Sequence, residues 1–325
     1  IWFSFEFGAF HFGSTAMQEL AAVRALLERI GDEPRAVHGA LHTFIESAEP
    51  DAINAVVGAV LDALHRHDDA PHNPRFNHTS LAASSAARLS LSRLVALAAR
   101  THADLLAPLL PRITVMATRI CGDAEGSVRD AFAEALYVAA LHCIDAISPR
   151  ELYTLLLAPA VQALERPSPS EQHGGAMALR QLLAALSPAQ LRDAVAPLSA
   201  VIRRHLKQPH THGRPSLLEC IVMMLGAVAS ATQVVPLVQM ALASCGASDW
   251  RERLAAVGAL RAAHSITDLP REVRVPVDSA LRTLRFDRVS VVRSAVVDAA
   301  ADGRSFRPPP PTPPESSKAA RRAAS

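Results

Sequence analysis

The sequence predicts an all-α fold, an α-solenoid of about seven helical hairpins. Half of the 325 residues are apolar but only 4% are aromatic, and Ala and Leu dominate the apolar half. This composition favours helices packed through small side chains over a sheet. The phrase Asp, four residues, Val-Arg, one residue, Ala also occurs twice, at 123–131 and 287–295, which indicates an internal repeat.

Basic residues near the start of a helical segment recur with a regular period. They are Arg88, Arg129, Arg214, Arg253 and Arg293. Their separations are 41, 85, 39 and 40 residues, and the longest equals two steps with one position, near His173, that lacks the arginine. A period of about 40 to 47 residues is typical of HEAT-type hairpins with two helices each. Such hairpins bury their apolar faces by stacking on one another.

Apolar spacing and turn residues divide residues 17–302 into seven pairs of helices. In chain order the pairs are 17–30 with 35–48, 51–67 with 80–101, 103–120 with 127–143, 149–166 with 171–186, 188–206 with 214–229, 232–245 with 250–265, and 270–286 with 290–301. Proline is tolerated in the first turn of a helix, where its missing N–H costs least. Four pairs have a proline at or just before their first helix, namely Pro50, Pro149, Pro188 and Pro270.

The two ends of the chain differ from the repeats. Residues 1–16 hold six aromatic side chains and lack the basic start of a signal peptide, so we expect an unstructured or artefactual leader. Residues 303–325 are rich in proline and carry five basic residues against one acidic residue, which predicts a disordered tail with a charge of +4. Proline-rich segments also serve as ligands of adaptor proteins.

The remaining motifs give no support for an enzyme or a cofactor. The net charge of +2 argues against a nucleic-acid partner, and no apolar run is long enough to cross a membrane. Phosphate-binding loops and nucleophile elbows are missing from the sequence, and its four cysteines lack metal-ligand spacing. The histidines of residues 65–78 lie in a polar stretch without paired ligand spacing, so we expect no metal site and no cofactor.

Asp123 and Arg129 lie six residues apart at an inter-helix turn, and so do Asp287 and Arg293. A carboxylate beside a helix N-terminus caps free N–H groups and pairs with arginine. In HEAT units these residues typically bond to neighbouring turns. We therefore expect these four residues to form a structural ladder.

The turns within the hairpins should lie along one edge of a solenoid, where they form a protein-binding surface. Trp250 stands out because it starts a helix and is followed by Arg251 and Arg253, a combination typical of an interface anchor. The competing interpretation is that Trp250 packs on the neighbouring repeat. Three arginines of other turns complete the expected contact set: Arg75, Arg214 and Arg288.

Four stretches in register resemble the plant Tortifolia/Spiral microtubule-associated family, which has TOG-like HEAT domains. They are Glu49–Leu64, His102–Leu136, Ser248–Leu260 and Leu284–Ala299. Trp250 matches the turn tryptophan that TOG domains use to bind tubulin, and Arg253 matches the basic residue three positions further on.

The resemblance implies a non-enzymatic protein that binds tubulin or microtubules through its intra-repeat turns and regulates microtubule dynamics or organisation. Its expected location is the cytoplasm, on the microtubule cytoskeleton. The alternative is a general HEAT-repeat adaptor, of the phosphatase-scaffold or transport-factor type, which binds a protein partner on its concave face.

Overall fold

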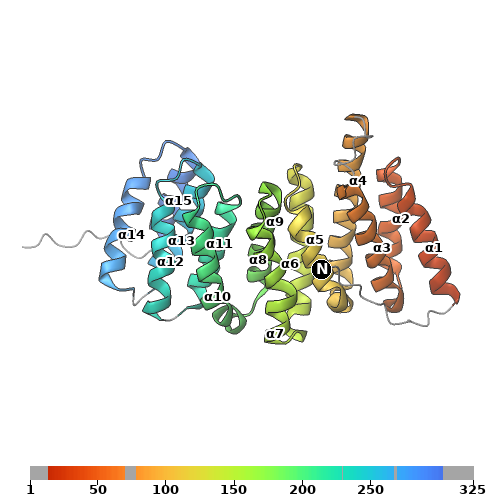
Figure 1. The fold of residues 1–325 in the computed structure, drawn as a ribbon, viewed down its shortest axis with the longest axis horizontal. Helices are drawn as coiled ribbons and strands as arrows, with labels where there is room; N and C mark the ends of the chain where they lie inside the picture. The colour runs from red at the N-terminus through yellow and green to blue at the C-terminus, as the bar shows by residue number, and fades with distance from the viewer. Residues whose placement is uncertain (1–13, 70–77, 229, 267–268, 303–325) are drawn as a thin grey trace, which may run out of the picture.

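The computed structural model describes residues 14–69, 78–228, 230–266 and 269–302. Within these ranges all regular structure is helical. Figure 1 shows the helices stacked side by side along the long axis, from α1 at one end to α14 and α15 at the other. This arrangement confirms the predicted all-α solenoid.

The helices form seven hairpins, each with a first and a second helix. The first helices are α1 (Ser14–Glu28), α3 (Pro50–Asp69), η2 with α5 (Ala103–Leu109 and Leu110–Ile120), α7 with η4 and α8 (Pro149–Glu151, Leu152–Leu157 and Ala158–Glu165), α10 (Pro188–Lys207), α12 (Ala231–Ser244) and α14 (Arg271–Leu284). The second helices are α2 (Pro34–Ser47), α4 (His78–Thr101), α6 (Gly126–Cys143, followed by η3, Ile144–Ala146), α9 (Pro169–Ala185), α11 (Arg214–Ala227), α13 (Trp250–His264) and α15 (Ser290–Asp302).

These bounds agree with the predicted pairs to within a few residues. One difference lies at the start, where residues 14–16, expected in the leader, belong to α1. The rest of the leader and the whole tail lie outside the described residues. In the described part of the chain no helix is both long and apolar enough to span a bilayer.

Local chemistry defines the start of two first helices, α7 and α10. Ser148 and Glu151 form a reciprocal capping box at α7, and Ser187 and Gln190 do the same at α10. In both helices a proline occupies the first position, where no N–H is needed. The connections between hairpins can therefore be short.

The hairpins share one core, and the second helices supply its closest contacts. Buried apolar side chains form a continuous cluster from Val23 in α1 to Val296 in α15. Phe132 of α6 is fully buried, and α6 packs on both α4 and α9. Many core positions are alanine, which allows neighbouring helices to approach closely. Each hairpin is thus stabilised by the hairpins on either side of it.

Residues at or beside the intra-hairpin turns contact the neighbouring hairpin, so that the turns lie along one edge, which we call the turn rim. The contacts in chain order are Gly31 with His67 near the end of α3, Arg88 within α4 with Asp123, Gly122 with Ser170, Gln172 with His212, and Ser248 with Arg288. Residues 70–77 of the second turn lie outside the described residues. Residues far apart in the sequence therefore form one continuous surface.

Candidate functional site: the turn rim

Buried ion pairs join neighbouring turns beneath the rim. Arg253 donates to both carboxylate oxygens of Asp287, at 2.6 and 2.9 Å, and Arg214 donates to both oxygens of Glu252, each at 2.8 Å. Arg88 donates to Asp123 at 2.6 Å. Each arginine belongs to one hairpin and each carboxylate to the next, so the pairs form rungs of a ladder.

Arginines near the start of the second helices also hold their own turn. Four of them donate to the carbonyl oxygen six residues earlier: Arg129 to Asp123 at 2.6 Å, Arg214 to Gln208 at 2.9 Å, Arg253 to Ala247 at 2.8 Å and Arg293 to Asp287 at 2.7 Å. Carbonyls after the end of a helix lack intrahelical partners, and the guanidinium supplies the missing donors. The spacing of six residues therefore reflects a bond to the backbone of the aspartate, and the aspartate side chain bonds to the arginine of the preceding hairpin.

The rung between Arg253 and Asp287 is almost inaccessible to water, with side chains 7% and 6% exposed. The hydrogen bond from Arg253 lowers the pKa of Asp287, and the Val289 amide, which donates to the same carboxylate at 2.8 Å, adds to the effect. The hydrogen bond to Asp287 raises the pKa of Arg253. Both groups therefore stay charged in the folded protein.

Glycines replace the rung between the third and fourth turns. Here the two turns approach through their backbones. A Cβ on Gly174 would lie 2.1 Å from the Thr118 carbonyl oxygen, and one on Gly122 would lie 2.1 Å from that of Ser170. Because no side chain fits at these distances, only glycine allows this contact.

The ladder changes the expected contact set. Arg253 and Arg214 were expected to face a partner, but their guanidinium groups are committed to the ladder and Arg253 is buried. Both residues belong to the series of arginines that recur about every 40 residues, and this spacing already indicated a structural role. Arg75, the third arginine in question, lies outside the described residues.

Trp250 and Arg251 remain at the rim. Asp249 caps α13 by accepting from the Arg251 amide at 2.9 Å, and the Arg251 guanidinium lies 4.9 Å from the centre of the indole ring. Trp250 is half-buried against the core, and Arg251 is exposed. Both residues line a shallow pocket between α11 and α13, together with the apolar residues Pro215, Val222, Leu254 and Ala255. Trp250 thus packs on the neighbouring hairpin with one part and reaches the surface with another.

The seventh turn adds a second pair of an aromatic residue and an arginine. Arg288 is exposed and reaches back to donate to the Ser248 carbonyl of the sixth turn at 3.2 Å. Phe286 is 87% exposed, and it was not among the contact residues that the sequence predicted. Exposed aromatics beside arginines are typical of binding interfaces. We call Trp250, Arg251, Phe286 and Arg288 the turn 6–7 patch.

Charge is unevenly distributed along the solenoid. Residues 17–187 hold 14 basic and 19 acidic residues, whereas residues 188–302 hold 14 basic and 10 acidic residues. The exposed turn residues follow this trend, with Asp32 and Glu33 in the first turn and Arg288 in the seventh. The turn 6–7 patch therefore lies in the part of the solenoid that has a net positive charge.

Side chains suited to metal binding or nucleophilic chemistry do not gather in the described residues. No group of three or more His, Cys, Asp or Glu residues there has the geometry to hold a metal ion. Burial raises the pKa of the Cys121 thiol to about 12 and that of Cys143 to about 11, and a thiol of that kind is a poor nucleophile at neutral pH.

Comparison with known proteins shows to which family the chain belongs. The model of the TORTIFOLIA1 N-terminal family matches residues 40–301, which include the second to the seventh turns. The chain belongs to the TORTIFOLIA1 N-terminal family. TORTIFOLIA1-like protein 4 of Arabidopsis thaliana is 26% identical over 252 residues, which cover 74% of this chain and 39% of that protein. The chain thus spans about two fifths of this relative's length.

The fold of this TORTIFOLIA1 N-terminal domain resembles that of a solved structure. Kap121p matches 88% of the chain with a TM-score of 0.60 at 18% identity, over 29% of its own length. A HEAT-like repeats protein from Thermococcus onnurineus NA1 matches 81% of this chain and 95% of its own, with a TM-score of 0.46 at 14% identity. The likeness to Kap121p shows the same helical-repeat architecture.

Proposed function

We propose that the protein is a non-enzymatic microtubule-associated protein that binds tubulin through the turn 6–7 patch and regulates microtubule dynamics or organisation. The observation that carries the proposal is the pairing of two aromatic side chains with two exposed arginines on adjacent turns. Tubulin presents an acidic surface, and arginine pairs well with carboxylates. Membership in the TORTIFOLIA1 N-terminal family, together with the resemblance of four stretches to plant microtubule-associated proteins, supports the same assignment.

The ladder suits this role because it fixes the patch. Arg253 bonds to the Ala247 and Ser248 carbonyls of the sixth turn and to the Asp287 side chain of the seventh. The residues that present Trp250 and Arg288 are thus held at a constant separation before any partner arrives. A preorganised surface loses less conformational entropy on binding.

The basic tail is a second contact in this proposal. Residues 303–325 have a sequence charge of +4 and add a salt-sensitive attraction to an acidic lattice. The location that follows is the cytoplasmic microtubule array. An adaptor that binds the proline-rich part of the tail is compatible with both contacts.

Co-sedimentation with microtubules at increasing salt tests the proposal. We expect the chain to pellet at low salt, and the double variant Arg251→Glu/Arg288→Glu to pellet at least about fivefold less, because each lost surface pair contributes up to about 1 kcal/mol. The matched control is Arg150→Glu/Arg192→Glu, which changes the net charge equally at exposed sites away from the patch.

The possible results distinguish the contributions of the turn 6–7 patch, the tail and the fold to pelleting. Trp250→Ala should weaken pelleting while leaving the thermal midpoint nearly unchanged; a large drop in that midpoint would mean that Trp250 serves packing alone. If neither the full chain nor a chain ending at residue 302 pellets at low salt, the microtubule assignment is wrong. Recovery of a non-tubulin partner that ignores the patch variants would favour the adaptor alternative.

A further inference from the structure

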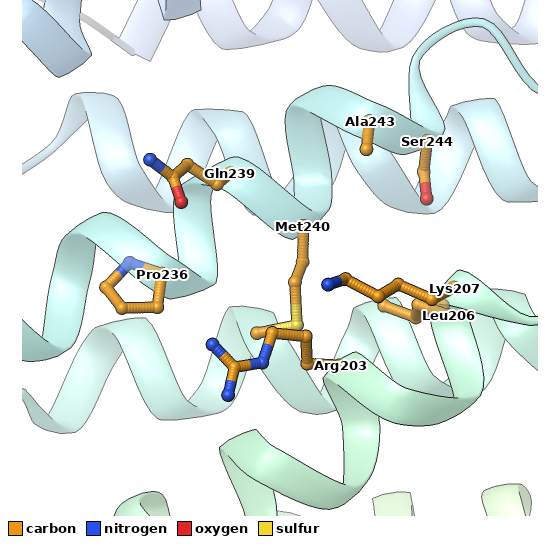
Figure 2. Close-up of a pocket in the computed structure, with 8 residues that line it drawn as sticks. All are labelled: Arg203, Leu206, Lys207, Pro236, Gln239, Met240, Ala243 and Ser244. Atoms are coloured by element: carbon orange, nitrogen blue, oxygen red, sulfur yellow. The ribbon is translucent and has the colours of Figure 1, made fainter.

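A shallow groove lies between α10 and α12, in the layer of first helices and away from the turn 6–7 patch. Figure 2 shows Met240 reaching from α12 toward α10, with the Lys207 amine and the Arg203 guanidinium on either side of it. The other lining residues are Leu206, Pro236, Gln239, Ala243 and Ser244. The groove therefore combines apolar surface with two cations.

The two cations of the groove are not compensated. Arg203 and Lys207 lie four residues apart on α10, so they project from the same face and repel each other. Among the described residues neither has a carboxylate partner, whereas the adjacent Arg204 pairs with Glu165 of α8. Helix α12, across the groove, contains no charged residue. The positive charge therefore remains available to a partner.

A purely structural role accounts for only one of these residues. Lys207 is the last residue of α10, where a cation stabilises the partial negative charge of the helix end. Arg203 lies a full turn earlier, where this effect has faded. The apolar lining beside Arg203 also needs another explanation.

We propose that this groove binds an extended acidic segment of a partner protein that also carries an apolar side chain. Alternate residues of an extended chain lie about 6–7 Å apart on one side, close to the roughly 5–6 Å between Cβ atoms of residues four apart on a helix. Two carboxylates that are two residues apart thus reach Arg203 and Lys207, and an apolar side chain two residues beyond them, on the same side of the segment, contacts the apolar lining of the groove. A nucleic acid fits less well, because the lining offers no aromatic ring for base stacking.

This site is independent of the proposed function, since it lies on other helices and does not require tubulin. The probe is a fluorescein-labelled oligoglutamate peptide with one central leucine, titrated with the full chain and followed by fluorescence anisotropy. The test variant is Arg203→Glu/Lys207→Glu. Its control is Arg150→Glu/Arg192→Glu, which has the same net charge and leaves any attraction to the basic tail unchanged.

We expect saturable binding that falls at least about fivefold in the test variant and stays near the wild-type value in the control. An oligoglutamate without the leucine should bind more weakly. If the reversal lowers the thermal midpoint, the milder Arg203→Gln/Lys207→Gln must show the same direction of change. The proposal is overturned if the wild-type chain does not bind, if both variants lose binding equally, or if single-stranded RNA displaces the peptide at a lower concentration than unlabelled peptide.

Discussion

The buried rung between Arg253 and Asp287 should hold the last two hairpins together. The guanidinium makes four hydrogen bonds, to the two carboxylate oxygens at 2.6 and 2.9 Å and to the Ala247 and Ser248 carbonyls at 2.8 and 3.0 Å. Arg253→Met keeps much of the apolar stem but leaves a buried carboxylate without its cation. We expect the free energy of opening the last hairpin to fall by about 3–5 kcal/mol.

A double-mutant cycle separates the interaction energy between Arg253 and Asp287 from the other effects of the Arg253→Met substitution. Asp287→Asn removes the charge and retains an acceptor for the Val289 amide, so Arg253→Met/Asp287→Asn should be less destabilised than the sum of the two single variants. We expect a coupling of about 2–3 kcal/mol. The exposed pair Arg204–Glu165, whose side chains are 53% and 49% exposed, serves as the control, with a coupling below about 1 kcal/mol.

Native-state hydrogen exchange in α15 is the appropriate assay, because hairpins of a repeat array can open one at a time. The exchange rates give the local opening free energy of α15 for each variant of the cycle. Additive effects of Arg253→Met and Asp287→Asn would refute the ladder as the element that joins the last two hairpins.

Three further predictions follow from packing and burial. Gly174→Ala should destabilise the folded protein by about 1–3 kcal/mol or more, because its Cβ would meet the Thr118 carbonyl oxygen at 2.1 Å. The control Gly226→Ala, whose Cβ would meet no atom within 4 Å, should be neutral or stabilising. Urea melts compare the two variants, and equal effects on stability would contradict the close approach at Gly174. Burial lowers the pKa of His205, so the unfolded chain takes up a proton at a higher pH than the folded protein. Stability should therefore fall as the pH drops below about 6.5, by up to about 1.4 kcal/mol per pH unit. His205→Leu should reduce this pH dependence in urea melts at pH 7.5 and 5.5, and an unchanged pH dependence would show that His205 does not contribute to it. The cysteine thiols, with burial raising the pKa of Cys245 to about 11, should react with Ellman's reagent far more slowly in the native protein than in guanidinium, and a rapid native reaction would show that the hairpins open.

The period of about 40 residues was sufficient to predict the fold, because each hairpin repeats the same local requirements. A proline or a capping serine begins several of the first helices, a turn follows, and an arginine lies near the start of most second helices. Pro50, Pro149 and Pro188 begin α3, α7 and α10, as the sequence predicts. A further periodic signal went unused: Pro197, Pro236 and Pro276 lie inside three successive first helices.

The surface residues of the rim were harder to predict than the fold, because residue type does not reveal which way a side chain points. Arg251 and Arg253 are two residues apart at the start of α13, and a helix directs them to different sides. Arg253 turns inward to the ladder, and Arg251 stays at the rim. Phe286 could not be recognised because burial of an aromatic residue in a turn depends on contacts with the next hairpin, which the sequence does not describe.

Hydrogen exchange of the full chain, with and without tubulin, is the most direct measurement of how the rim is used. The proposed function predicts that tubulin slows exchange most in residues 245–251 and 285–289, the two turns that carry the turn 6–7 patch. Unchanged exchange in both turns when tubulin is bound, with protection confined to other helices, would contradict it.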